Sequence, residues 1–142
     1  MSRRLGQRLI ALLGVAVCVA LLGAAVTSAA SGGEGRFSGK TAQGYPLRLA
    51  ADQHHAQLIR VKVKLRCRDG GLLYDDLSDF EAADLRNGRF DDLQRGSGDE
   101  VHWRGSFNGD TARGSIRVKD KLKNGVRCDS GTVGFTVRRA GN

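Results

Sequence analysis

The most distinctive polar pattern in the sequence is a row of cations within the stretch 58–67. Here Arg60, Lys62, Lys64 and Arg66 alternate with apolar residues. Alternate residues of an extended strand lie on one face about 6.6 Å apart, so the four cations are expected to form a basic face, and such a face attracts polyanions. A second basic row lies in the stretch 113–119. The candidate polyanion-binding residues are Arg60, Lys62, Lys64, Arg66, Arg117 and Lys119.

Two interpretations of the basic row stay open. In the first, the row binds an anionic cell-wall polymer or an acidic lipid surface. In the second, the lysines and arginines only keep the sheet soluble and prevent edge-to-edge pairing of strands. No aromatic residue interleaves with the row. This argues against base stacking, and no sequence-specific nucleic-acid partner is expected.

Motifs that could catalyse a reaction or bind a metal are weak. The turn that begins at Asp129 reads Asp-Ser-Gly-Thr and resembles that of aspartic proteases, but 13 residues follow Asp129, too few for the rest of a half-site. His54 and His55 are adjacent, yet no further ligand stands at the spacing that a metal site needs. Acidic residues between positions 75 and 92 lack the alternating oxygens and the glycine of a calcium loop. We therefore predict no catalytic residue, no metal and no cofactor.

The N-terminus has the composition of an export signal. Arg3, Arg4 and Arg8 precede an uncharged apolar run at 9–26, and small residues follow at 27–33. The sequence thus predicts a signal peptide at 1–30 and a secreted or cell-wall-associated protein. The apolar run of 18 residues also reaches the lower limit for a membrane span, so an uncleaved N-terminal helix that anchors the protein remains the alternative. Removal of residues 1–30 lowers the formal net charge from +8 to +5, because it removes three arginines.

Two cysteines, Cys67 and Cys128, remain beyond the predicted signal peptide. Two cysteines in an exported domain are typically paired, and neither of these has a second Cys or His at metal-ligand spacing. We predict a disulfide bond between them. For a separation of 61 residues, that bond would stabilise the fold by about 4 kcal/mol.

The elements that must position these residues are strands. Alternation of apolar and polar residues recurs at 47–49, 58–67, 101–108, 113–119 and 132–138. One apolar and one polar face per strand is typical of antiparallel sheets. The segment 78–88 would suit a short helix, but we prefer a strand that leads into the Asn87-Gly88 turn. The prediction is one all-β domain over 31–142, ordered over about 35–139, an antiparallel meander of about eight or nine strands in a small barrel or sandwich.

A ten-residue motif occurs twice, at 35–44 and 105–114, with agreement at six of ten positions. We interpret it as one hairpin used twice, in which a turn follows an inward Phe and a Gly starts the next strand. The motif comes together with a strand that ends at Cys67, an Asn-Gly-Arg-Phe hairpin, and Cys128 before the last strand. In this order the sequence resembles small, functionally uncharacterised secreted β-rich proteins of actinobacteria. The resemblance implies a compact β-barrel or sandwich and brings no catalytic residues.

The expected function is a non-enzymatic one, in which the domain binds anionic cell-surface polymers through the basic strand face. A small β-barrel carrier of an apolar ligand is the alternative, and it requires an open cavity behind Trp103, Phe107 and Phe135. A hydrolase with a carboxylate site is a third hypothesis. It requires two acidic side chains from separate strands that face each other in a cleft.

Overall fold

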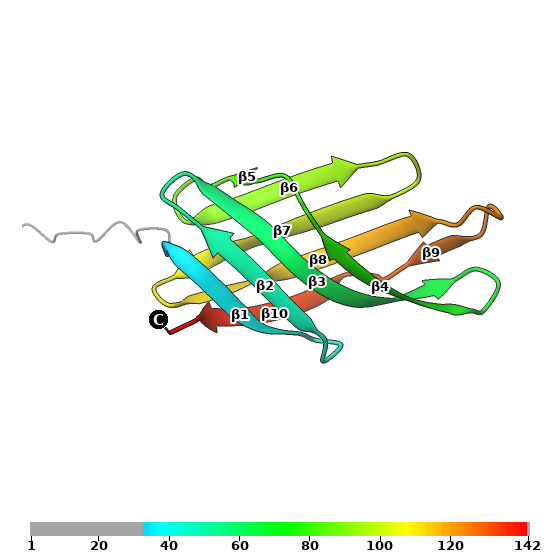
Figure 1. Cartoon of the computed structure of the whole chain (residues 1–142), viewed down its shortest axis with the longest axis horizontal. Coiled ribbons are helices and arrows are strands. Elements are labelled where there is room, and N and C mark those ends of the chain that lie inside the picture. The colour runs from blue at the N-terminus through cyan, green and yellow to red at the C-terminus, as the bar shows by residue number, and fades with distance from the viewer. Residues whose placement is uncertain (1–32, 142) are drawn as a thin grey trace, which may run out of the picture.

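The structure, a computed structural model, describes residues 33–141. The predicted signal peptide and the alternative N-terminal anchor lie outside the described residues. Within the described part of the chain, no helix has the length and apolar character needed to cross a membrane. The strands, shown in Figure 1, are β1 (Gly35–Thr41), β2 (Pro46–Ala51), β3 (His55–Cys67), β4 (Leu72–Ser78), β5 (Ala83–Asp84), β6 (Arg89–Arg95), β7 (Glu100–Asn108), β8 (Thr111–Lys121), β9 (Arg127–Asp129) and β10 (Val133–Arg139).

The strands form a closed barrel with further strands outside it. The path β10–β1–β2–β3–β9–β8 closes on itself because β8 also pairs with β10, and the pairings in it are antiparallel. β4 and β5 pair with β3 outside this ring, whereas β7 and β6 extend the sheet beyond β8 (Figure 1). The all-β prediction is confirmed. Ten strands are present because two very short ones, β5 and β9, add two and three residues of pairing.

The disulfide bond lies where the ring is held by few backbone pairs. β3 and β9 share two register pairs, Arg66 with Asp129 and Cys67 with Cys128. Cys67 and Cys128 are bonded to each other at this point, with their Cα atoms 3.9 Å apart, which confirms the predicted disulfide. The bond therefore adds a covalent link to the short seam that closes the barrel, in addition to restricting the unfolded chain.

Apolar side chains fill the interior, as the alternation along the strands predicts. Aromatic rings form the largest contacts: the ring centroids of Phe90 and Trp103 lie 4.7 Å apart, and those of Phe37 and Phe107 lie 5.0 Å apart. Trp103 is fully buried. Burial of one such side chain contributes on the order of 1.5–3 kcal/mol. The rings of the two motif copies therefore meet in the core and pack β1 against β7.

The repeated motif nevertheless adopts two different hairpins, so the predicted reuse of one hairpin is wrong. In the first copy, β1 continues through Gly39 to Thr41 and the chain turns afterwards, with Gly44 at a φ of 85°. In the second copy, β7 ends at Asn108 and the chain turns at Gly109, with a φ of 57°. Asn-Gly readily forms a tight turn, whereas the first copy has serine in place of the asparagine and stays extended there.

The segment 78–88 leads into a hairpin, as the preferred strand interpretation predicted. Arg86 and Arg89 exchange backbone hydrogen bonds of 2.8 and 2.9 Å across the turn. Between them, Asn87 and Gly88 have φ values of 51° and 70°. Positive φ at both central residues identifies a type I′ turn, the turn that matches the twist of two antiparallel strands.

Candidate anion-binding face

β3 presents its cations on the outside of the barrel. The valine and leucine side chains at 61, 63 and 65 are fully buried, so the residues between and after them point away from the core. A register shift opposite β2 turns both Ile59 and Arg60 outward. We call the four outward cations the β3 row; its members are Arg60, Lys62, Lys64 and Arg66.

The first cation of the β3 row is neutralised. Arg60 donates two hydrogen bonds to Asp76 of β4, from Nε to Oδ1 at 2.8 Å and from Nη2 to Oδ2 at 2.5 Å. These hydrogen bonds hold the pKa of the Asp76 carboxyl below its ordinary value, and the charges of Arg60 and Lys62 lower it further. Lys62 is the register partner of Asp76, but both carboxylate oxygens are already engaged by Arg60.

The other three cations of the row carry no ion pair within residues 33–141. Their positions on β3 are opposite outward residues of β4. Lys64 is the register partner of Tyr74, and Arg66 is that of Leu72. Tyr74 and Leu72 are both more than half exposed. On the β4 side, the positive charge at this end of the row is therefore bordered by apolar and aromatic surface. On the β9 side, Arg66 is the register partner of Asp129, whose carboxylate binds Arg117.

Gln43, in the turn between β1 and β2, holds the backbone beneath the row. Its Nε2 donates to the carbonyl oxygen of Lys64 at 2.9 Å, and the N–H of Lys64 donates to its Oε1 at 2.8 Å. Along this edge of β3, the pairing with β2 reaches Val61 and the pairing with β9 begins at Arg66. The side-chain amide of Gln43 forms strand-like hydrogen bonds to β3 in the gap between them. Sequence reasoning missed this role, and the signal was slight: Gln43 is one of the positions at which the two motif copies differ.

Two tyrosines lie beside the β3 row, although the sequence of β3 itself contains none. Tyr45 precedes β2 and Tyr74 belongs to β4; their ring centroids are 6.1 Å apart with an interplanar angle of 85°. The Nζ atom of Lys62 lies 5.8 Å from the centre of the Tyr45 ring. Burial and the neighbouring Tyr74 raise the pKa of Tyr45. No aromatic residue interleaves with the cations along β3, but Tyr45 and Tyr74 place two rings beside them.

Two cations of the second basic row, Arg117 and Lys119 on β8, form ion pairs. Arg117 donates to both oxygens of Asp129, at 3.1 and 2.6 Å. Lys119 donates to Oε1 of Glu100 at 2.6 Å, and Arg95 donates to the other oxygen of Glu100 at 3.2 Å. These hydrogen bonds lower the pKa of both carboxyls. We call Arg117 and Lys119 the β8 row; both of its cations form ion pairs, whereas in the β3 row only Arg60 does so within residues 33–141.

The remaining motifs of the sequence analysis form turns. Asp129, in the turn that resembles an aspartic protease, accepts the N–H of Gly131 at 2.8 Å while its carboxylate binds the β8 row. Asp52 accepts the N–H groups of His54 and His55, both at 2.7 Å, in the loop before β3. These hydrogen bonds lower the pKa of Asp52. Among residues 33–141, no three His, Cys, Asp or Glu side chains lie together in a way that could hold a metal ion.

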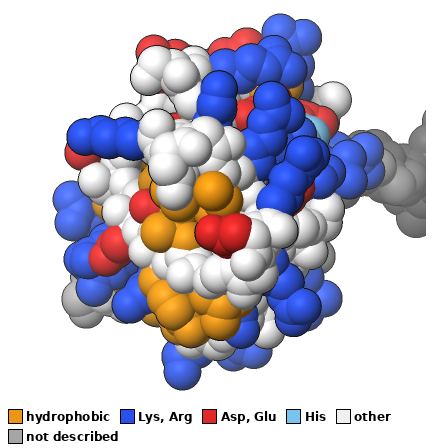
Figure 2. Space-filling model, turned by 90° about the vertical axis from the view of Figure 1, so that its right-hand side faces the viewer, with side chains coloured by type: hydrophobic (Ala, Val, Ile, Leu, Met, Phe, Trp, Pro, Cys, Tyr) orange, Lys and Arg blue, Asp and Glu red, His pale blue; other side chains and the backbone are white. Residues whose placement is uncertain are grey.

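Carboxylates from three segments converge where the β6–β7 and β8–β9 turns lie. Burial raises the pKa of Asp120, and so do the hydrogen bond and charge of Asp99 and the charge of Asp75. The pKa of Asp75 is raised by burial and by the charge of Asp99. Figure 2 shows this end of the molecule, where Lys and Arg side chains surround apolar and acidic ones. The cleft beside Asp99 and Asp120 is lined by seven cations, among them Arg66, and by four carboxylates.

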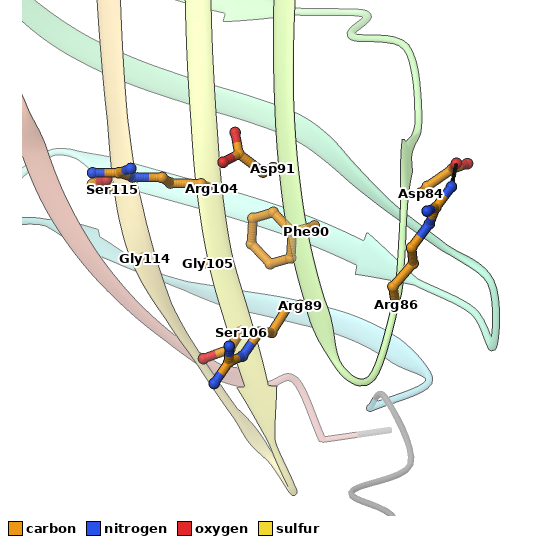
Figure 3. Close-up of a pocket in the computed structure, with 10 residues that line it drawn as sticks. All are labelled: Asp84, Arg86, Arg89, Phe90, Asp91, Arg104, Gly105, Ser106, Gly114 and Ser115. Atoms are coloured by element: carbon orange, nitrogen blue, oxygen red, sulfur yellow. Dashed lines mark hydrogen bonds and ion pairs between the residues drawn. The ribbon is translucent and has the colours of Figure 1, made fainter.

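A shallow groove lies over β6, β7 and β8 (Figure 3). Its floor contains two paired glycines, Gly105 and Gly114, and a Cβ atom at Gly105 would lie 2.7 Å from the ring of Phe90. Arg86 and Asp84 border it and form a loose ion pair of 3.5 Å. The residues that line it are Asp84, Arg86, Arg89, Phe90, Asp91, Arg104, Gly105, Ser106, Gly114 and Ser115. Because two carboxylates accompany its three arginines, the groove has less excess positive charge than the β3 row.

No protein-family model, no curated protein and no solved structure matches this chain. The resemblance to secreted actinobacterial proteins therefore stays a prediction. The functional argument therefore rests on the chemistry of the surface. Among the surfaces described above, the β3 row has the largest excess of positive charge without ion pairs.

Proposed function

We propose that this protein is an exported, non-enzymatic β-barrel domain that binds an anionic cell-surface polymer through the β3 row. One observation carries the proposal: Lys62, Lys64 and Arg66 carry no ion pair within residues 33–141, whereas both cations of the β8 row do. Cations spaced about 6.6 Å apart on a rigid strand attract a polymer of repeated negative charges. The predicted export signal and the disulfide support a partner outside the cell, either an anionic wall polymer or an acidic lipid surface.

The packing of the barrel favours surface binding over transport of an apolar ligand. Trp103, Phe107 and Phe135 were expected to border a cavity in an apolar carrier. All three are at most 5% exposed and belong to one continuous core. The carboxylates at 75, 99 and 120 do face one another, as a hydrolase would require, but their cleft identifies no substrate. The unpaired cations of the β3 row are the stronger observation.

The test compares two variants with the same change in charge. Lys62→Ala/Lys64→Ala removes two unpaired cations, and Arg117→Ala/Lys119→Ala removes two paired ones. Binding of the wild-type protein to purified teichoic acid should weaken with salt. The slope of log K against log salt should fall by about 0.7 for each lost contact in the first variant and change much less in the second.

Three results would contradict the proposal. Binding that does not depend on salt would show that charge is not the main interaction. The same loss in both variants would show that net charge matters and the β3 row does not. If the wild-type protein bound neither teichoic acid nor vesicles that contain phosphatidylglycerol, both an anionic wall polymer and an acidic lipid surface would be excluded as partners.

A further inference from the structure

The tyrosines beside the β3 row provide a ring surface next to unpaired cations. Tyr74 is 53% exposed. Tyr45 is partly covered, with Lys62 over its ring, and it meets Tyr74 edge to face. In this arrangement Tyr45 holds the ring of Tyr74 in position, and Tyr74 offers the more accessible surface to a planar partner.

Most hydrogen-bond acceptors near these rings are already occupied. Both polar atoms of the Gln43 side chain bind the backbone of Lys64. Both oxygens of Asp76 bind Arg60. Apart from the tyrosine hydroxyls, the surface therefore offers the donors of Lys62, Lys64 and Arg66 together with rings and apolar area. A sugar polymer displays hydroxyl groups that need donors and acceptors, whereas phosphates need donors alone.

The cations of β3 run beside an exposed strip of β4 that contains one ring. The cations follow β3, at about 6.6 Å per step. Tyr74 and Leu72 follow β4 as the direct register partners of Lys64 and Arg66. Within the described part of the chain, β4 pairs with β3 alone, so the far edge of β4 is unpaired. A chain whose charged backbone runs along one line and whose planar groups hang to one side matches this surface.

From this arrangement we infer that the β3 row binds single-stranded nucleic acid without sequence preference. The phosphates lie against Lys62, Lys64 and Arg66, and a base stacks on Tyr74. A surface of cations beside an aromatic ring is the general chemistry by which proteins hold single strands, because every base has a flat face. The inference goes beyond the proposed function, because it assigns a second class of anionic polymer to the same β3 row.

The experiment separates the contribution of charge from that of the bases. Fluorescence anisotropy of the full predicted mature chain is measured with a labelled oligo-dT of 20 nucleotides and with an abasic oligonucleotide of the same phosphate count. We expect oligo-dT to bind more tightly by about five- to a hundredfold, the usual contribution of one stacked base. Tyr74→Leu should abolish this preference and Tyr74→Phe should retain it. Lys62→Ala/Lys64→Ala should weaken binding of both probes.

Each outcome decides between the two proposals. Equal, salt-dependent binding of oligo-dT and the abasic probe would overturn base stacking and leave the anionic-polymer function in place. No binding of either probe, of teichoic acid or of acidic vesicles would overturn both. If the preference for oligo-dT persists in Tyr74→Leu, with the fold verified by circular dichroism, the bases stack at a site other than Tyr74 and the inference is overturned. Tyr74-dependent binding of an acidic polysaccharide with equal affinity would show that the ring recognises sugars.

Discussion

The basic residues of β3 and β8 meet different partners on the neighbouring strands. On β8, Arg117 and Lys119 each bind a carboxylate, one from β9 and one from the start of β7. On β3, Lys64 and Arg66 stand opposite a tyrosine and a leucine of β4. Both rows alternate with buried apolar residues, and both are formed by lysine and arginine. β9 lies beside both rows, and Asp129 is the register partner of Arg66 as well as of Lys119. What separates the rows is that the Asp129 carboxylate binds Arg117, and that the β3 row has β4, with Leu72 and Tyr74, on its other side.

This difference shows that the net charge of a sheet face depends on the residues of neighbouring strands and not on one strand alone. A cation with a carboxylate as cross-strand neighbour contributes little to the field outside the protein, because the two charges cancel at short range. Lys64, beside Tyr74, keeps most of its field, whereas Asp129 on β9 reduces the field of Arg66. Asp129 reaches the β8 row because β9 pairs with both β3 and β8 at the point where the barrel closes. Topology therefore decides which row stays open to an anionic partner.

The largest expected effect is on the seam that lies between the two rows. Replacing both disulfide cysteines with serine (Cys67→Ser/Cys128→Ser) should lower the free energy of unfolding by about 2–5 kcal/mol, as measured by urea denaturation. Reductant should destabilise the wild-type protein to the same degree and leave the variant unchanged. A wild-type protein that is indifferent to reductant would show that β3 and β9 are held without the bond.

Mutations on the neighbouring strands can reverse the difference in ion pairing between the β3 row and the β8 row. Leu72→Glu places a carboxylate opposite Arg66 and should weaken teichoic-acid binding by about fivefold, since one cation near a charged surface contributes on that scale. Glu100→Gln frees Lys119 of the β8 row, leaves Asp129 beside Arg66 unchanged, and should strengthen binding by a similar factor. If neither variant changes the affinity, local pairing does not control binding and the distinction between the rows has no functional meaning.

Local features of the fold could be predicted from the sequence because they depend on neighbours along the chain. Alternation in 58–67 predicts the buried and exposed sides of β3, and Asn87-Gly88 predicts a tight turn. The disulfide follows from two cysteines in a chain with an export signal. The repeated motif gave a wrong prediction because the two copies agree at six positions but differ at one that decides where the chain turns. The second copy has Asn108 before Gly109, whereas the first copy has serine at the corresponding position.

The composition of the candidate site could not be predicted in the same way. Tyr45 and Tyr74 lie outside the stretch that contains the cations, and they join it through pairings of β3 with β2 and β4. The ion pair between Arg117 and Asp129 depends on closure of the ring, which brings together residues of β8 and β9. Periodicity tells which side of a strand faces out but carries no information about which strand lies beside it.

The smallest expected effect is a difference in stability between the rows that depends on pH. Arg117 lowers the pKa of Asp129, so the pair stabilises the fold above the pKa of the unfolded carboxyl, and this contribution is lost as the pH falls through the lower, folded value. Arg117→Ala should therefore reduce the melting temperature at neutral pH by roughly 2–4 °C, and the reduction should shrink steadily below about pH 4. Lys64→Ala removes no ion pair and should change the melting temperature little at either pH. Equal shifts for the two variants would mean that the ion pairs of the β8 row do not stabilise the fold, and the row would then be as free to bind anions as the β3 row.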